Sequence, residues 1–365
     1  MLIKRIVAEL VYINYNLINP KKKDYIMSKK LMIVGGTGFL GYYTAKLALS
    51  KGYEVGSISI LDDDLVNKDL DSWYPKEIKN TLLDVFEAKE EELVEAMKGY
   101  DYMIYAVGPD DRYTPKAPSY DFFHYRLVDS VAKVFRAAEA AGVKKAAVYN
   151  SYFAYFDRRY PEMKLKEKHP YIRCRVEQAA ILNEQKKKME VVVLELPYIF
   201  GSMEARLPIW RNVFLDRYVN GKKTVYFSKG GTTMIAIEHI AEAGIGALEY
   251  GEDGERYPIG DQNRKFKWML EYMAECKGVK KKVVCPPTWL CVLGAKSIEN
   301  KDHKKGLEGG LDYALVMKEI MSIDMVIEEE VMDEVNAKLH ISRGGLEEAI
   351  QKTMDRCYPN PGDFK

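Results

Sequence analysis

The stretch LMIVGGTGFLGYYTAKLALS, residues 31–50, decides the fold. A short apolar run leads into a glycine-rich turn, and apolar residues at helical spacing follow. In such a unit Gly35 permits a tight turn, Gly38 lets the backbone approach a pyrophosphate, and Gly41 lets helix and strand pack closely, while the helix N-terminus offers free N–H groups. We therefore predict a dinucleotide-binding turn whose contacting residues are Gly35, Gly36, Thr37, Gly38, Phe39, Leu40 and Gly41.

Strand and helix patterns alternate after this turn. Apolar or β-branched runs predict strands at 31–34, 53–61, 80–83, 102–106, 146–149 and 191–196. Helical spacing predicts helices at 39–50, 89–97, 122–141 and 171–187, with loops at 108–120 and 153–169. Strands joined by helices indicate a parallel sheet covered on both faces. The predicted fold class is α/β, a Rossmann-type doubly wound parallel sheet with a smaller, more helical C-terminal substrate-binding domain.

The alternation of strands and helices ends after Pro197. Helical patterns dominate from there on, at 207–221, 237–250, 265–277 and 317–339. We assign residues 28–200 to a dinucleotide-binding domain and 201–365 to the substrate-binding region, with some of its segments returning to the first domain. Residues 1–27 are either an N-terminal extension or the product of a misplaced start, because Met27 stands directly before the first strand.

Composition excludes several classes of protein. Of 365 residues 47% are hydrophobic and 30% charged, which indicates a globular chain with a real core, and the formal charge of +1 selects for neither nucleic acid nor an anionic surface. The five cysteines contain no Cys-x-x-Cys and the five histidines are scattered, so we expect no metal site and a reducing cytoplasm. No apolar stretch is long enough to span a membrane.

Ser151, Tyr171 and Arg175 are the candidate catalytic residues. Ser151 ends a predicted strand, at the edge where an open parallel sheet binds its ligands. Tyr171 and Arg175 lie four residues apart and therefore share one face of the next helix. A tyrosine hydroxyl is a poor base near neutral pH, so a fixed cation beside it is required for proton transfer in a carbonyl or alcohol redox step. Arg175 supplies that charge in this prediction.

The glycine spacing GGTGFLG is similar to the opening of the extended short-chain dehydrogenases, the NAD-dependent epimerase/dehydratase family. The resemblance continues in LLDVFE (82–87), AAGVKKAAVYNS (140–151), VVVLELPYIFG (191–201), IAIEHIAEAGIGALE (235–249), RYPIGD (256–261) and GGLEEAIQ (344–351), and covers roughly residues 28–360. It implies NAD or NADP as cofactor, with Asp84 near the adenine. Further cofactor contacts that it implies are Val85, Ala106, Val107, Gly108 and Pro197. It also implies a possible homodimer through the helices near Phe122 and Tyr171.

The sequence departs from the family at the catalytic motif. Where the family has Tyr-x-x-x-Lys, this sequence has Tyr171-Ile-Arg-Cys-Arg175. Arginine is bulkier than lysine and does not readily lose a proton. A second match, Tyr160 to Lys164, contains Pro161 and follows Ser151 too closely. We therefore rank Tyr171 ahead of Tyr160.

The end of the second strand leaves the choice of cofactor open. An acid there accepts the ribose hydroxyls of NAD and repels the 2′-phosphate of NADP. Ser59 or Ile60 stands at the deciding position, and Asp62 or Asp63 tilts the prediction slightly towards NAD. The alternative is that these aspartates only cap the strand in solvent.

The sequence indicates only the chemical class of the substrate. The segment 125–129 lacks an asparagine that many family members have there. Glu195-Leu196-Pro197 lacks the arginine that often precedes this proline in the family. Residues 198–201 lack the asparagine that usually follows it in nucleotide-sugar enzymes. We therefore expect an NAD(P)-dependent oxidoreductase or epimerase acting on a small or lipid-like carbonyl compound. The alternative is a catalytically drifted dinucleotide-binding regulator or RNA-associated protein. The apolar stretch 289–294 is expected in the core or in the wall of the substrate pocket.

Overall fold

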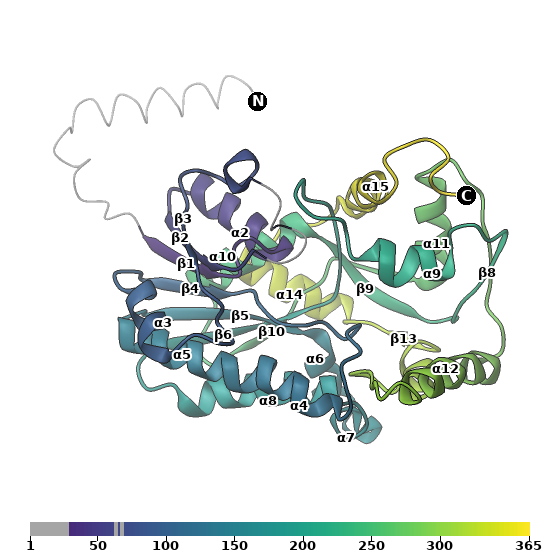
Figure 1. The fold of residues 1–365 in the computed structure, drawn as a ribbon, viewed down its shortest axis with the longest axis horizontal. Coiled ribbons are helices and arrows are strands. Elements are labelled where there is room, and N and C mark those ends of the chain that lie inside the picture. The colour runs from purple at the N-terminus through teal and green to yellow at the C-terminus, as the bar shows by residue number, and fades with distance from the viewer. Residues whose placement is uncertain (1–28, 62–64, 66–68) are drawn as a thin grey trace.

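The computed structural model describes residues 29–61, 65 and 69–365. Its centre is a seven-stranded sheet in the order β10-β6-β5-β4-β1-β2-β3, in which all neighbouring strands are parallel (Figure 1). The strands are β1 (Lys30–Val34), β2 (Glu54–Ser59), β3 (Lys79–Leu82), β4 (Tyr102–Tyr105), β5 (Lys145–Ser151), β6 (Glu190–Leu196) and β10 (Arg256–Pro258). The order reverses between β1 and β4, as in a doubly wound Rossmann fold. The predicted fold class is confirmed.

Alternate strand residues face opposite layers of helices. Leu31 and Ile33 of β1 pack towards α2 (Phe39–Ser50) and α10 (Ile237–Tyr250). Met32 and Val34 pack towards the other layer, which consists of α3 (Glu90–Met97), α5 (Ser130–Ala141) and α8 (Pro170–Gln185). Both faces of the sheet are therefore buried, which explains why its strands are continuously apolar.

The predicted helix 122–141 begins earlier and is interrupted. It consists of α4 (Ser119–His124), a π-helical turn η3 (Tyr125–Asp129) and α5. Gly142 ends α5 with φ of 93°, the left-handed conformation that glycine adopts without a Cβ clash.

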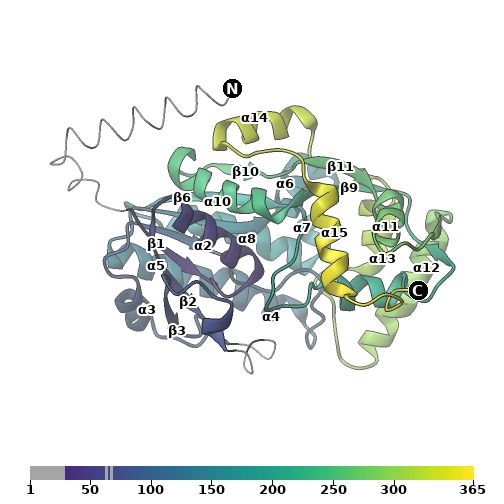
Figure 2. The same cartoon turned by 90° about the horizontal axis from the view of Figure 1, so that it is seen from above.

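The second half of the chain lies beside the large sheet (Figure 2). It packs around a further core, to which Phe123, Phe156 and Tyr171 of the first half also contribute. Its strand β9 (Gly231–Ala236) pairs with β7 (Tyr198–Phe200), β11 (Gln262–Lys265) and β13 (Asp324–Met325), and β8 (Thr224–Tyr226) pairs with β12 (Lys282–Val284). Its helices include α9 (Asp216–Tyr218), α11 (Phe266–Glu275), α12 (Thr288–His303), α13 (Tyr313–Leu315), α14 (Glu329–Leu339) and α15 (Leu346–Cys357). Two segments from this half, α10 and β10, belong to the large sheet and its helical layer.

The prediction of a loop at 153–169 is wrong. Residues Tyr152–Arg159 form α6, and a short helix α7 (Leu165–Lys168) follows. Ser151 caps α6 by accepting a hydrogen bond from the backbone N–H of Phe153, and Tyr152, Phe153 and Phe156 are buried. The cap and the apolar face stabilise a helix that charged residues at 157–159 obscure in the sequence.

The single long helix predicted at 317–339 is also wrong. A π-helical turn η6 (Val316–Ile320) is followed by β13, and α14 begins only at Glu329. The chain leaves the helix because Asp324 and Met325 pair with β9. Tertiary pairing overrides helix propensity here.

Residues 289–294 lie in α12, but Trp289, Leu290 and Leu293 are exposed to solvent. The expectation that this stretch belongs to the core or to a pocket wall is therefore wrong. Among the described residues, no helix is long and apolar enough to cross a membrane. The proposed extension, residues 1–27, lies outside the described part of the chain.

Candidate active site

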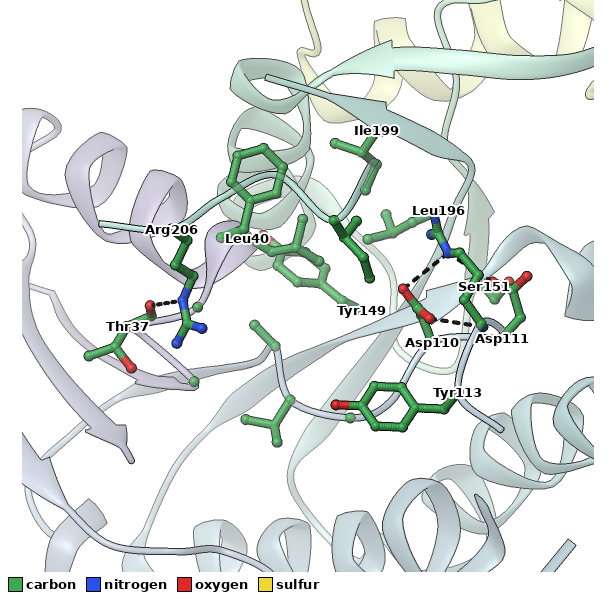
Figure 3. Close-up of a pocket in the computed structure, with 18 of the residues that line it drawn as sticks. Thr37, Leu40, Asp110, Asp111, Tyr113, Tyr149, Ser151, Leu196, Ile199 and Arg206 are labelled. Carbon is green, nitrogen blue, oxygen red and sulfur yellow. Dashed lines mark hydrogen bonds and ion pairs between the residues drawn. The ribbon is translucent and has the colours of Figure 1, made fainter. Parts of the chain in front are cut away.

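A cleft of about 640 Å³ opens at the carboxyl ends of the parallel strands (Figure 3). It brings together most of the predicted site residues, namely Gly35, Thr37, Gly38, Phe39, Leu40, Asp84, Val85, Ala106, Val107, Gly108, Ser151, Tyr171, Arg175 and Pro197. Gly36 and Gly41 lie behind its wall and do not line it. Asp62 and Asp63 lie outside the described residues.

The glycine turn is closed by tight backbone contacts. Gly35 has φ of 92°, and its carbonyl oxygen accepts a hydrogen bond of 3.0 Å from the N–H of Gly38. A Cβ at Gly41 would lie 2.2 Å from that same oxygen, and one at Gly36 would lie 2.3 Å from Oγ of Ser57. Gly36 and Gly41 therefore let the turn pack against β2 and α2, while Gly38 is the N-cap residue of α2 and lines the cleft.

Arg206 reaches the turn from the second half of the chain. Its Nε donates to the carbonyl oxygen of Thr37 at 3.1 Å, and Figure 3 shows the two residues at one end of the cleft. The backbone N–H of Thr37 donates to Oγ of Ser59, also at 3.1 Å, so β2 holds the turn from the other side. Arg206 was not predicted, because residue spacing gave no sign that a distant loop returns to the turn.

Ser151 lies where β5 ends and α6 begins. Its Oγ accepts a hydrogen bond of 3.3 Å from the N–H of Phe153, which fixes the hydroxyl at the edge of the cleft. A serine hydroxyl that accepts one hydrogen bond still has its own proton to donate. Ser151 can therefore donate to an oxygen atom of a bound molecule.

Tyr171 and Arg175 meet on one face of α8. Nε of Arg175 donates to Oη of Tyr171 at 3.0 Å, and both side chains are buried. The two Nη atoms donate to the carbonyl oxygens of Tyr149 and Pro109, at 3.3 and 3.4 Å, and Nη1 also donates to Oε1 of Gln178 at 3.1 Å. Arg175 thus ties β5, α8 and the loop after β4 to the tyrosine hydroxyl.

Burial and charge act on Tyr171 in opposite directions. Burial raises the pKa of Tyr171, and the Arg175 guanidinium opposes that rise without cancelling it. The expected lowering by Arg175 is present, but burial outweighs it. The hydroxyl therefore keeps its proton near neutral pH, which suits a proton donor.

The competing pair, Tyr160 and Lys164, lies away from the cleft. Neither residue lines it, and the ring of Tyr160 stacks on Phe156 at 6.3 Å. Lys164 follows a short 3-10 turn and has φ of 50°. The geometry favours Tyr171.

An acid–base cluster lies in the loop after β4, at the other end of the cleft from Arg206 (Figure 3). Nε of Arg112 lies 3.2 Å from Oδ2 of Asp110 and 4.0 Å from Oδ1 of Asp111. Its guanidinium stands 5.3 Å from the ring centroid of Trp210. Burial raises the pKa of Asp111, and Arg112 opposes that rise. This segment was predicted only as a loop, and nothing in its sequence indicates that its charges line a cleft.

Aromatic and aliphatic side chains make up much of the remaining lining of the cleft. They are Tyr152, Phe153, Leu196, Tyr198, Ile199, Leu207, Ile209 and Trp210. Their rings and aliphatic chains give this part of the lining more carbon than hydrogen-bonding atoms. Such a lining favours an apolar ligand that carries few polar groups.

Residues 31–260 match the NAD dependent epimerase/dehydratase family. The chain belongs to this family. The predicted relationship is confirmed, and so is the expectation of NAD or NADP as cofactor.

Two kinds of relative accompany the family match. A sterol-4-alpha-carboxylate 3-dehydrogenase (decarboxylating) from Dictyostelium discoideum is 24% identical over 261 residues, which cover 65% of this chain and 74% of that protein. Among solved structures, gox2253 has a TM-score of 0.71 at 16% identity, covering 93% of this chain and all of that chain. The UDP-glucose 4-epimerase of Bifidobacterium longum, solved with NAD+ and UDP, has a TM-score of 0.62 at 14% identity and covers 92% of this chain and all of that one. These structures establish the shared fold.

The dinucleotide of this epimerase/dehydratase family is compatible with the cleft. Open space lies in front of Gly38, where an added Cβ meets only the oxygen of Gly35 at 3.1 Å. A side chain longer than hydrogen at Gly38 would enter the approach to the α2 N-terminus.

Among the described residues, no group of acidic, histidine or cysteine side chains is arranged to hold a metal ion.

Proposed function

We propose that this protein is an NAD(P)-dependent oxidoreductase that interconverts a ketone and a secondary alcohol on an apolar, lipid- or sterol-like substrate. The proposal rests on the hydrogen bond from Nε of Arg175 to Oη of Tyr171. Both residues line the same cleft as the glycine turn and the apolar side chains. The family membership supports the reaction class. NAD is the proposed cofactor ahead of NADP.

The cofactor would lie along the glycine turn. The N–H groups at the start of α2 would hold its pyrophosphate, and Arg206 and Thr37 border the same end of the cleft. Asp84 and Val85, after β3, line the side assigned to the adenine. When bound, the nicotinamide supplies or takes the hydride.

The protein supplies the proton and the orientation. In the reducing direction, Ser151 donates a hydrogen bond to the carbonyl oxygen and Tyr171 gives its Oη proton to that oxygen while the carbonyl carbon gains the hydride. In the oxidising direction the tyrosine takes the alcohol proton instead. Arg175 positions Oη and stabilises the phenolate that remains after proton donation.

The substrate class rests on the far end of the cleft. Tyr152, Tyr198 and Trp210 provide broad apolar surfaces, whereas a nucleotide-sugar needs many hydrogen-bonding partners. Arg112 is the cation in this wall and is available to a polar substituent of the substrate. The sterol-carboxylate substrate in the name of the Dictyostelium relative has this chemistry, an apolar body with one acidic group.

The first experiment is a calorimetric titration of the full chain with NAD(H) and NADP(H) separately. We expect saturable binding, tighter for NAD(H), and its loss in Gly38→Glu, which fills the approach to the α2 N-terminus. Circular dichroism and thermal melting of that variant verify that it folds. Failure of the wild-type chain to bind either dinucleotide would overturn the proposal.

A substrate screen follows, with sterol and long-chain ketones beside UDP-sugars. We expect turnover of the apolar ketones and none of the UDP-sugars, with activity depending on Tyr171. Cofactor binding without turnover of any compound would instead favour the alternative of a dinucleotide-binding regulator. Turnover of UDP-sugars alone would contradict the proposed substrate class.

A further inference from the structure

Helix α12 presents apolar side chains to solvent on its first two turns. Trp289 is 62% exposed, Leu290 43% and Leu293 56%. Residues 289 and 293 are one helical turn apart, and so are 290 and 293, so the three side chains form one patch. The opposite side of the helix packs on α13 and η6, with Ala295 buried. Figure 1 shows α12 at the periphery of the second half, away from the large sheet.

Lysines follow the patch along the same helix and just beyond its end. Lys296, Lys301, Lys304 and Lys305 are all exposed. Among the described residues, none of the four forms an ion pair with a carboxylate. The acids of this segment, Glu299 and Asp302, are half-buried, so the exposed surface is basic although the whole chain is nearly neutral.

The strand pair that leads into α12 along the chain carries a second exposed aromatic ring. Tyr226, at the end of β8, is 68% exposed and pairs with Val284 of β12, four residues before α12 begins. Lys223, Lys229 and Lys282 are also on this strand pair or next to it. Tryptophan, tyrosine and leucine accompanied by lysines are the residues that favour the boundary between water and lipid headgroups.

We propose that this surface, defined by Trp289, Leu290, Leu293 and the following lysines, docks the protein reversibly on an anionic lipid membrane. The apolar side chains enter the headgroup boundary, and the lysine ammonium groups contact lipid phosphates and carboxylates. A protein partner is less favoured, because the exposed charges of this segment are the four lysines while its two acids are half-buried, and such a row of cations suits a continuous negative surface. The helix lies on the membrane and does not cross it.

Flotation of the full chain with lipid vesicles tests the proposal. We expect binding to phosphatidylcholine vesicles that contain phosphatidylserine, and little binding to phosphatidylcholine alone. Each of the substitutions Lys296→Gln and Lys301→Gln lowers the partition coefficient about fivefold, from the usual contribution of one lysine near an anionic surface. The double variant Trp289→Ser/Leu293→Ser lowers it by at least about tenfold, because both side chains are apolar anchors.

Leu82→Ser is the matched control, because Leu82 is 59% exposed on the edge strand β3 of the large sheet. It leaves vesicle binding unchanged, and thermal melting shows whether each variant is folded. Absence of wild-type binding to the anionic vesicles would overturn the proposal. It would equally be overturned if sedimentation showed a dimer that Trp289→Ser/Leu293→Ser dissociates, since a second copy would then cover this surface.

Discussion

Nε of Arg175 donates a 3.0 Å hydrogen bond to Oη of Tyr171, one turn earlier on α8. The family resemblance implies a lysine at this position, and a lysine has one ammonium group to share among its partners. The guanidinium donates at the same time to Tyr149, Pro109 and Gln178. In this protein the guanidinium therefore also links three segments that line the cleft.

Two substitutions distinguish the effect of the Arg175 charge from the effect of its hydrogen bonds. Arg175→Met leaves the tyrosine without a cation, and we expect kcat to fall by about 10²–10⁴-fold. Arg175→Lys keeps the charge and restores the family pattern, so it retains more activity than Arg175→Met. Steady-state kinetics with calorimetric cofactor affinities measure both effects. Equal kcat in the methionine variant and the wild type would remove Arg175 from the proposed mechanism.

The pH dependence follows from the raised pKa of Tyr171. Oxidation of the alcohol needs the phenolate, so its rate rises with pH up to that pKa. Reduction of the ketone needs the protonated hydroxyl, so its rate is level below the pKa and falls above it. Arg175→Met raises the pKa further and shifts the oxidation profile to higher pH. Tyr171→Phe abolishes both reactions while cofactor affinity stays within a few-fold.

The contacts formed by neighbouring residues could be predicted from the sequence. The glycine turn, the parallel pairing of strands joined by helices, and the shared helix face of Tyr171 and Arg175 all follow from spacing along one or two elements. Arg206 and Arg112 could not be predicted, because their positions depend on how distant loops fold back on the sheet. Helix α6 was missed because its cap and its buried aromatic face were masked by charges in its last turn.

Arg112 is expected to determine which substrates bind. It stands over Trp210 at the apolar end of the cleft, far from the glycine turn in sequence. Arg112→Met therefore raises KM for an acidic or strongly polar substrate by roughly 10–100-fold, the usual range for a lost charged hydrogen bond, and leaves cofactor affinity unchanged. Arg217→Met, at an exposed arginine of α9, is the control. An unchanged KM in Arg112→Met across the substrate panel would refute this assignment.

His169 couples the stability of the site to pH. It directly precedes α8, it is fully buried, and its Nδ1 accepts a 3.1 Å hydrogen bond from the N–H of Asp312. Burial lowers its pKa from 6.5 to about 4, because a charged imidazole would lose its water. Below pH 6.5 His169 therefore binds a proton in the unfolded chain, whereas in the folded chain it stays neutral down to about pH 4.

Stability is full above pH 6.5 and falls as the pH drops towards 4. The loss is roughly 3 kcal/mol, from 1.36 kcal/mol for each unit of pKa difference. Urea unfolding at a series of pH values measures it, and His169→Asn flattens the dependence while the exposed His303→Asn does not. The N–H of Tyr171 donates to the carbonyl oxygen of Gly310, next to this contact. Protonation of His169 in the folded chain therefore also loosens the tyrosine, so activity falls as the pH approaches 4. A pH dependence of stability that is the same in His169→Asn and in the wild type would show that another group controls the acid transition.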